Sequence, residues 1–493
     1  MTKIQAPSTE IIRPEDKRLG IGPSFIYGLQ HVLTMYGGII AVPLIIGQAA
    51  GMNRQDIGLL IAAALFMGGL ATLLQTLGVP FFGSQLPLVQ GVSFASVATM
   101  VAIVNGGGGI QAVFGAVIVS AAIGLLIAPI FSKIVKFFPP VVTGTVITTI
   151  GLTLMPVAAN WAMGGNAKAP GYGSTSNILL AFGTLAIVLL LSKLGNATIS
   201  RLSILLAMII GTVVAVILGK ADFSKVGVGP FFAFPTPFHL GMPTFQIAGI
   251  ISMVIVVLVI LTETTADILA VGEIVGTKVD SKRIAAGLRA DMASSIVSPI
   301  FGSFTQSAFA QNVGLVAVTG IKSRFVVSAG GVILVALGLL PIVGRIVAAV
   351  PMSVLGGAGI VLFATVAASG IRTLATVDYK NNMNLIIVAV ALGFGMLPIA
   401  SPTFYDDFPT WFSTIFHSGI SSAALMAILL NLLFNHLKRG NSENPSVFAA
   451  GTDRQIDISI LTHLKDGDRC EDGKILDADG REIPLVNKPA TGH

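Results

Sequence analysis

The amino-acid sequence predicts an all-α polytopic membrane protein, and three observations lead to this fold class. Of the 493 residues, 54% are hydrophobic and only 11% are charged, whereas a soluble protein carries about 25% charged residues. The mean hydropathy is +0.87, and the apolar residues gather in segments of membrane-spanning length. The 56 glycines are typical of a membrane bundle, in which small residues let helix backbones approach closely.

Fourteen segments have the length and apolar composition of transmembrane spans. They are 23–47, 56–78, 86–104, 109–131, 138–160, 176–192, 202–219, 246–271, 284–300, 303–319, 325–347, 351–371, 383–399 and 416–437. The third and the tenth are the least hydrophobic of the fourteen. Their glycine and polar residues predict two broken helices, in each of which an extended stretch leads into a half-helix.

Basic residues between the spans predict that both termini are cytoplasmic. The inside connections then hold Lys133, Lys136, Lys193, Arg201, Lys278, Lys282, Arg283, Lys322, Arg324, Arg372, Lys380, Lys438 and Arg439. The outside connections hold only Arg54, Lys168, Lys220, Lys225 and Arg345. Because these basic residues are scattered singly between apolar spans, they indicate topology and argue against a nucleic-acid partner.

Fourteen spans divide into two halves of seven, and an odd number gives the halves opposite orientations in the membrane. This is the inverted-repeat plan of many transporters. The third span of the first half contains Ser93-Phe94-Ala95, and the third span of the second half contains Ala308-Phe309-Ala310. The match predicts that each span is discontinuous, with the exposed backbone groups and the positive end of its half-helix facing a cavity.

The two ends of the chain differ from the spans in composition. The first 20 residues are polar, without the apolar core of a signal peptide. From Gly440 the sequence becomes polar, and Asp472-Gly473 and Asp479-Gly480 predict two turns, with a short hairpin between or around them. The only cysteine, Cys470, lies in this tail. A disulfide scaffold or a cysteine-based metal site within one chain is therefore excluded.

Ionisable residues at membrane depth are functional candidates because burying them in lipid costs free energy. Glu263 and Asp267 are four apart and share a helix face, which suits both binding of a polar ligand and proton coupling. The alternative is that this helix has already left the membrane. Asp291 has two equally weighted roles, bracing of the broken helix or proton handling. For His31, hydrogen bonding between helices is favoured over a role in organising the site.

Two amides in the tenth span, Gln311 and Asn312, offer donors and acceptors to a heterocycle that alternates carbonyl and N–H groups. The alternative is that they hydrogen-bond neighbouring helices. Phe94 could stack on a flat ring or serve only in packing.

These residues resemble a known signature. Gln311-Asn312-Val313-Gly314, followed by Thr319-Gly320, is similar to the signature of the nucleobase–ascorbate transporters, the nucleobase:cation symporter-2 family. Gly28-Leu29-Gln30-His31, the stretch Gln90 to Phe94 and the stretch Thr262 to Asp267 support the resemblance. It covers roughly residues 20–437.

The resemblance implies a seven-plus-seven inverted-repeat fold with a core domain and a gate domain. The divisions are a cytoplasmic N-terminal segment 1–20, the core domain 21–131 and 246–347, the gate domain 132–245 and 348–439, and a cytoplasmic tail 440–493. The core holds the substrate and slides against the gate in an elevator-like motion, and the gate also forms a homodimer in the bilayer.

The resemblance also implies roles for site residues. Glu263 and Gln311 hydrogen-bond the substrate ring, Phe94 stacks on it, and backbone groups near Phe94 and Ala310 add hydrogen bonds. Asn312 holds the geometry of the site, and Ser93 occupies a position that varies among purine transporters. Asp291 resembles an essential carboxylate, while Asp267 and His31 resemble residues tied to coupling and site organisation.

By the same resemblance, a glutamine at position 311 implies a bacterial xanthine or uric acid permease, with a proton as coupling ion and no other cofactor or metal. The residues do not separate xanthine from uric acid. Alternatives are a uracil or other nucleobase permease, or an anion transporter of the same fold. A carboxylate at position 263 and the short tail argue against the anion transporter. A membrane-embedded enzyme is disfavoured, since there is no His-Glu-x-x-His and no catalytic serine with a partner histidine.

Overall fold

A computed structural model of the chain describes residues 13–131, 138–224, 226–379, 382–437, 468–471 and 474–476. It divides the chain into two units, Met1–Gly440 and Asn441–His493. Most of the N-terminal segment and of the polar tail lies outside the described residues, as do the basic residues Lys133, Lys136, Lys225, Lys380, Lys438 and Arg439. In the second unit, strand β3 (Arg469–Glu471) pairs antiparallel with β4 (Lys474–Leu476). This hairpin flanks Asp472-Gly473, where the sequence predicts a turn.

The first half of the larger unit begins with a single 3₁₀ turn and continues as helices interrupted by one short strand. The elements are η1 (Pro14–Asp16), α1 (Ile21–Ala49), α2 (Arg54–Leu77), β1 (Gln90–Val92), η2 (Phe94–Ser96), α3 (Val97–Ile103), η3 (Val104–Gly108), α4 (Gly109–Ile127), η4 (Ala128–Ile130), α6 (Pro140–Thr153), α7 (Met155–Ala162), α8 (Thr175–Leu194), α9 (Ala197–Arg201) and α10 (Ser203–Ile217).

The second half follows a similar order, with a strand again preceding a short helix. Its elements are α11 (Ile247–Val275), α12 (Ser281–Val297), η6 (Ser298–Phe301), β2 (Gln306–Ala308), α13 (Ala310–Thr319), α14 (Arg324–Gly338), α15 (Pro341–Ala348), α16 (Met352–Leu374), α17 (Asn382–Ala400), α18 (Thr410–Phe416), α19 (Gly419–Asn431) and η7 (Leu432–His436).

Nine helical segments in the described part of the chain are long and apolar enough to cross a membrane. They become ten if α14 and α15, bent by 78° at their junction, form one span. Several predicted spans fall short of this test for visible reasons. The helices α3 and α4 run on as one segment, and α10, α12 and α13 are each shorter than 18 residues.

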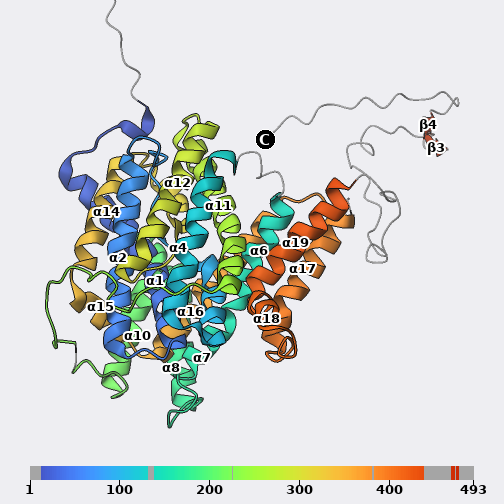
Figure 1. The fold of residues 1–493 in the computed structure, drawn as a ribbon. Helices are drawn as coiled ribbons and strands as arrows, with labels where there is room; N and C mark the ends of the chain where they lie inside the picture. Colours follow the sequence, from blue (N-terminus) through green and yellow to red (C-terminus); the bar gives the residue numbers. More distant parts are fainter. Residues whose placement is uncertain are drawn as a thin grey trace, which may run out of the picture. The chain divides into compact units, whose positions relative to one another are not determined.

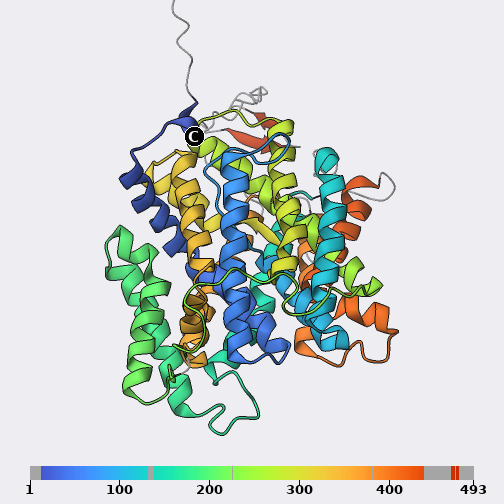
Figure 2. The same cartoon turned by 60° about the vertical axis from the view of Figure 1, so that its left-hand side comes forward.

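Two groups of helices pack within the larger unit (Figure 1). In one group α1, α2 and α14 contact one another, α15 packs on α2 and α14, and α4 packs on α11 and α12. In the other, α16 packs on α6, α7 and α8, α17 packs on α19, and both of these contact α6. Figure 2 shows the gold helix α14 beside the blue helices α1 and α2, while the green pair α8 and α10 lies at the edge.

Glycines allow the helices of the first group to pack closely against one another. A Cβ atom at Gly69 of α2 would lie 2.7 Å from the carbonyl oxygen of Gly331 in α14. A Cβ atom at Gly28 of α1 would lie 2.7 Å from the nitrogen of Gly330. Both distances are too short for any side chain, so these crossings require glycine, as small residues do generally where membrane helices meet.

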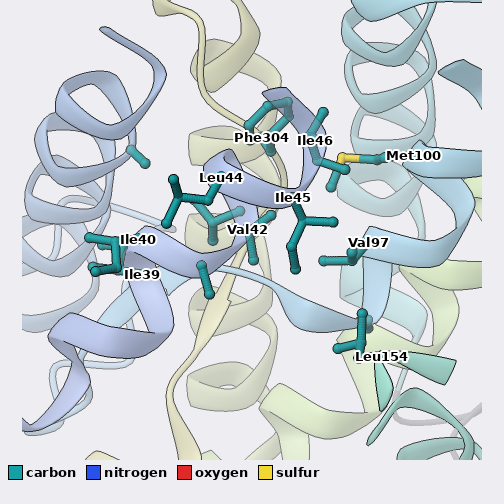
Figure 3. Packing of buried hydrophobic residues seen from close by; sticks show 14 of the residues in the cluster. Ile39, Ile40, Val42, Leu44, Ile45, Ile46, Val97, Met100, Leu154 and Phe304 are labelled. Atoms are coloured by element: carbon teal, nitrogen blue, oxygen red, sulfur yellow. The ribbon is translucent and has the colours of Figure 1, made fainter. Parts of the chain in front are cut away.

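Apolar side chains fill the interior between the helices. Figure 3 shows α1 residues such as Ile45 and Ile46 packed near Val97 and Met100 of α3, with Leu154 and Phe304 nearby. All of these side chains are buried. They fix the C-terminal part of α1 relative to the first turn of α3, so the polar segment that precedes α3 is held between closely packed helices.

Candidate ligand-binding site

Two short paired strands form the framework on which the site is built. β1 and β2 pair antiparallel, and every residue in them is buried. The pairing continues at both ends, since the N–H of Ser93 donates to the carbonyl oxygen of Thr305 at 2.8 Å and the N–H of Phe309 donates to that of Val89 at 3.1 Å. The strands therefore satisfy their backbone groups inside the bundle, which is the condition for non-helical chain at membrane depth.

A short helix follows each strand. β1 leads through Ser93 into η2 and α3, and β2 leads through Phe309 into α13. The Ser93 hydroxyl accepts a hydrogen bond from the N–H of Ala95 at 3.3 Å. The first N–H groups of a helix have no partner within it and carry the positive end of the helix dipole. Two such helix starts, at Phe94 and Ala310, lie on one cavity.

This cavity has a volume of about 380 Å³, which is within the usual range for small-molecule sites. Its walls come from the strand–helix junctions, from α11 and from helices α6 and α16. The lining residues are Val92, Ser93, Phe94, Ala95, Ile147, Ile150, Glu263, Ser307, Ala308, Phe309, Ala310, Gln311, Thr365, Val366, Ala368, Ser369 and Arg372. The described residues contain no group of three potential metal ligands.

Glu263 of α11 and Gln311 of α13 both line the cavity, as the sequence predicts for two ligand-binding side chains. Glu263 is partly buried and Gln311 is exposed to the cavity. Together they offer carboxylate oxygens, an amide oxygen and an amide NH₂ group. Such a set can match the edge of a planar ring that carries both N–H and carbonyl groups.

Phe94 also lines the cavity, with its ring packed among other aromatic rings. Its centroid lies 6.5 Å from that of Phe309 and 6.1 Å from that of Phe363, the latter in an edge-to-face arrangement. The Phe363 ring also contacts Trp161, with centroids 6.0 Å apart. This packing holds Phe94 in place while part of its ring remains accessible for stacking on a flat ligand.

The two other carboxylates do not line the cavity. Asp291 of α12 is fully buried, and its carboxylate accepts hydrogen bonds from Thr264 at 2.7 Å and from Gln75 at 3.5 Å. The bond from Thr264 links α12 to α11 beside Glu263. Asp267 is 8% exposed, and its Oδ2 has no hydrogen-bond partner among the described residues.

Asn312 and His31 form a contact behind the site. The buried Asn312 amide nitrogen lies 3.1 Å from His31 Nδ1 and donates to the His31 carbonyl oxygen at 3.0 Å. Neither residue lines the cavity. The contact ties the first turn of α13 to α1, as expected for a histidine that is hydrogen-bonded between helices.

Sequence reasoning missed the polar face of α16. Thr365, Ser369 and Arg372 are spaced four and three residues apart, and all three line the cavity opposite the half-helices. Counting basic residues assigns Arg372 only to a connection between spans. In the described part of the chain no carboxylate lies within ion-pair distance of Arg372. The i, i+4, i+7 spacing of the three residues is the signal that could have found them.

Apolar helices of membrane-spanning length around a cavity lined by two half-helix starts and a carboxylate define a membrane transport protein. The chain matches the model of a permease family over residues 22–404. It belongs to this family, the nucleobase–ascorbate transporters whose signature the sequence around Gln311 resembles.

Several relatives are similar over most of their length. The uric acid transporter UacT of Escherichia coli (strain K12) is 40% identical over 423 residues, which are 85% of this chain and 88% of the relative. The xanthine permease of Bacillus subtilis (strain 168) is 40% identical over 418 residues, 85% of this chain and 95% of the relative. The xanthine permease XanP of Escherichia coli (strain K12) is 30% identical over 445 residues, 87% of this chain and 96% of the relative.

Solved structures show a similar fold at low sequence identity. The transmembrane domain of the cyanobacterial bicarbonate transporter BicA has a TM-score of 0.55 at 14% identity and covers 83% of this chain and 96% of that domain. The murine anion transporter Slc26a9 in its inward-facing state has a TM-score of 0.57 at 13% identity, covering 88% of this chain and 73% of that chain.

Proposed function

We propose that this protein imports an oxidised purine, xanthine or uric acid, across the bacterial inner membrane by proton symport. The observation that carries the proposal is the joint position of Glu263 and Gln311 on one cavity between two half-helix starts. Relatives named as uric acid and xanthine transporters, about 40% identical over most of both chains, support this substrate class.

The recognition chemistry follows from the groups on the cavity. An oxidised purine is planar and alternates ring N–H and carbonyl groups along its edge. The Gln311 amide donates to a carbonyl and accepts from an N–H, while Glu263 accepts from a second N–H. Backbone N–H groups at Phe94 and Ala310 donate to ring carbonyls, and the Phe94 ring stacks on the purine face. Ser93 contributes through its backbone and by shaping the cavity wall.

Glu263 is the group that couples substrate to protons in this proposal. Uric acid is an anion at neutral pH, so a negatively charged Glu263 would repel it and a protonated one would bind it. Asp267, one turn further along α11, shares this face and passes the proton on. Asp291 and His31 hold the neighbouring helices in place through Thr264 and Asn312. The proton is the only coupling ion, and no cofactor takes part.

We also propose the seven-plus-seven inverted repeat with fourteen spans, broken at the third and the tenth. Its support is the repeated order of strand and short helix, and the matched bonds from Ser93 to Thr305 and from Phe309 to Val89. The core comprises 21–131 and 246–347, and the gate comprises 132–245 and 348–439. The two packed helix groups support this division. The core would slide against the gate in elevator fashion, the gate would form a homodimer, and both termini would be cytoplasmic.

Uptake of radiolabelled xanthine and uric acid into cells expressing the protein tests the proposal. Saturable uptake that an uncoupler abolishes is the expected result. Uptake that persists with the uncoupler would overturn proton coupling, and no uptake of either purine would overturn the substrate class. A competition panel of purines and uracil against one labelled purine then ranks the substrates. Competition by uracil alone would favour a pyrimidine permease, and bicarbonate uptake without purine uptake would favour an anion transporter.

A further inference from the structure

We propose that Thr72 and Ser295 are a symmetric pair of positioning residues that set the register of the two strands and, through it, where the half-helix N–H groups meet the substrate. The inference rests on the proposed function for its role in transport. The geometry on which it is built stands independently of the substrate.

Thr72, near the end of α2, is fully buried. Its hydroxyl accepts a hydrogen bond from the backbone N–H of Gln90, the first residue of β1, at 2.9 Å. The same hydroxyl lies 2.8 Å from the carbonyl oxygen of Gly68, four residues earlier in the helix, and 3.3 Å from the carbonyl oxygen of Gln90. One hydroxyl thus joins the helix to both backbone groups of one strand residue.

Ser295, near the end of α12, makes the same set of contacts in the second half of the chain. It is fully buried, and its hydroxyl accepts from the N–H of Gln306, the first residue of β2, at 2.8 Å. It donates to the carbonyl oxygen of Asp291, four residues earlier, at 2.8 Å and lies 3.4 Å from the carbonyl oxygen of Gln306. Hydroxyls that bond only the carbonyl four residues earlier are common in helices, whereas the added bonds to a strand are not.

The strand ladder confirms that these two contacts are equivalent. The sequence distance from Gln90 to Gln306 equals that from Ser93 to Phe309. The bond from Ser93 to Thr305 accordingly maps onto the bond from Phe309 to Val89. This pairs Phe94 with Ala310, whereas the sequence match pairs Phe94 with Phe309. The one-residue difference arises because backbone hydrogen bonds, and not side-chain identity, determine the pairing.

The Thr72 and Ser295 hydroxyls determine where the two helix starts lie on the cavity. Phe94 and Ala310, the two helix starts on the cavity, each lie four residues after the glutamine whose N–H is held. In a paired strand a slip of one residue turns every side chain to the opposite face. Holding the first residue of each strand therefore fixes both the register and the position of the N–H groups four residues on. Because β1 and β2 are hydrogen-bonded to each other, each hydroxyl also helps to hold the opposite strand in place.

Removing either hydroxyl leaves a buried N–H without its acceptor, at a cost comparable to a lost hydrogen bond. We expect Thr72→Val and Ser295→Ala each to raise the KM for the transported purine by about ten-fold, with the maximal rate per inserted transporter unchanged. Thr72→Ser, which retains the hydroxyl, should restore the wild-type KM. The double variant should raise KM less than the product of the two single effects, because both hydroxyls hold one ladder.

Two matched controls separate positioning from general destabilisation. Thr184 and Ser298 are buried, and each donates only to the carbonyl four residues earlier, at 2.9 and 2.8 Å. Thr184→Val and Ser298→Ala remove a similar hydroxyl without touching a strand. Unchanged KM in the controls with raised KM in the two test variants supports the proposal. Equal effects in all four variants, or an unchanged KM in Thr72→Val and Ser295→Ala, would overturn it.

Amide hydrogen exchange in the purified full-length protein tests the same idea without transport. Thr72→Val should speed exchange in segments 89–93 and 305–309 together, and Ser295→Ala should do the same. Unchanged exchange in both segments would overturn the positioning role whatever the substrate. If the wild-type protein takes up no purine while exchange rises as expected, the proposed function fails and the positioning role is retained.

Discussion

Arg283 Nη2 lies 2.7 Å from Glu15 Oε1, and the Glu15 side chain is fully buried. This ion pair joins the segment before α1 to the start of α12. Arg283 also donates from Nε to the carbonyl oxygen of Ser84 at 2.6 Å. Next to it, Asp16 pairs with Arg324 of α14 at 2.7 Å. Residues 14–16 therefore tie the segment before α1 to the starts of α12 and α14 in the second half of the chain.

The first prediction is that Glu15→Gln destabilises the protein. The substitution leaves the half-buried Arg283 without its counter-charge, and breaking a buried pair on one side costs about 3–5 kcal/mol. Thermal unfolding in detergent should show a clearly lowered midpoint. Lys17→Gln changes an exposed charge two residues away and should leave the midpoint unchanged. Equal midpoints for Glu15→Gln and wild type would contradict the structural role of the pair.

The second prediction concerns pH and Asp16. Burial by itself raises the pKa of this carboxyl, but hydrogen bonds from Arg324 and Arg13 outweigh it, so the pKa of Asp16 lies below its ordinary value. The ionised form then contributes stability that is present above the unfolded-state pKa of about 3.9 and is lost as pH falls through the lower folded-state pKa.

Comparison of wild type with Asp16→Asn between pH 7 and pH 3 measures this contribution. The difference in melting temperature should be constant near neutral pH and shrink as the medium becomes acidic. A difference that grows on acidification would show that Asp16 does not gain from ionisation in the folded protein.

Sequence patterns predicted the parts of the site whose chemistry is unusual for a membrane. Glu263 and Gln311 were found because polar groups are rare in apolar spans, and both line the cavity. The polar face of α16 was missed because Arg372 lies near a helix end, where a basic residue ordinarily reports orientation. The pair of Glu15 with Arg283 could not be predicted, since nothing local marks a contact between residues so far apart in the chain. The short strands were foreseen only as extended segments, because pairing depends on the packing of α2 and α12 behind them.

The third prediction is loss of transport in Glu263→Gln and in Gln311→Ala, with normal insertion in the membrane. Each change removes a hydrogen-bonding group from the cavity wall, and a ligand group left unpaired in a buried site costs several-fold to a thousand-fold in affinity, roughly 1–4 kcal/mol. Uptake assays normalised to membrane expression measure it. Glu273→Gln, at an exposed position further along α11, is the control. Normal transport by both site variants would refute the proposed site.

The fourth prediction is that Arg372→Gln weakens uptake of anionic urate more than uptake of neutral xanthine. Arg372 lines the cavity from α16. Its positive charge attracts an anionic ligand there, and dissolved salt partly screens this attraction. The KM for urate divided by the KM for xanthine should therefore rise in the variant. This rise should be smaller at high ionic strength. A uniform change in both KM values would assign Arg372 to packing and not to charge selection.

The fifth prediction concerns buried hydroxyls that join the two helix groups. Thr99 Oγ1 of α3 lies 2.7 Å from Ser418 Oγ and 3.1 Å from Ser421 Oγ of α19, and Ser421 lies 3.2 Å from Ser252 of α11. All four residues are buried. In the proposed elevator motion these contacts between the proposed core and gate domains would break, so they would favour the state described here over the alternative.

Thr99→Val should lower the preference for this state by about 1 kcal/mol, roughly a five-fold shift in population. Asn105, further along the chain from Thr99, lines a second cavity of about 490 Å³ between α3 and the segments flanking α18. In a Cys470→Ser background, a cysteine at position 105 should react faster with a soluble maleimide when Thr99→Val is present. Thr145→Val removes a buried hydroxyl that bonds only within α6 and should leave the rate unchanged. Equal labelling rates with and without Thr99→Val would show that these hydroxyls do not restrain the motion of the core against the gate.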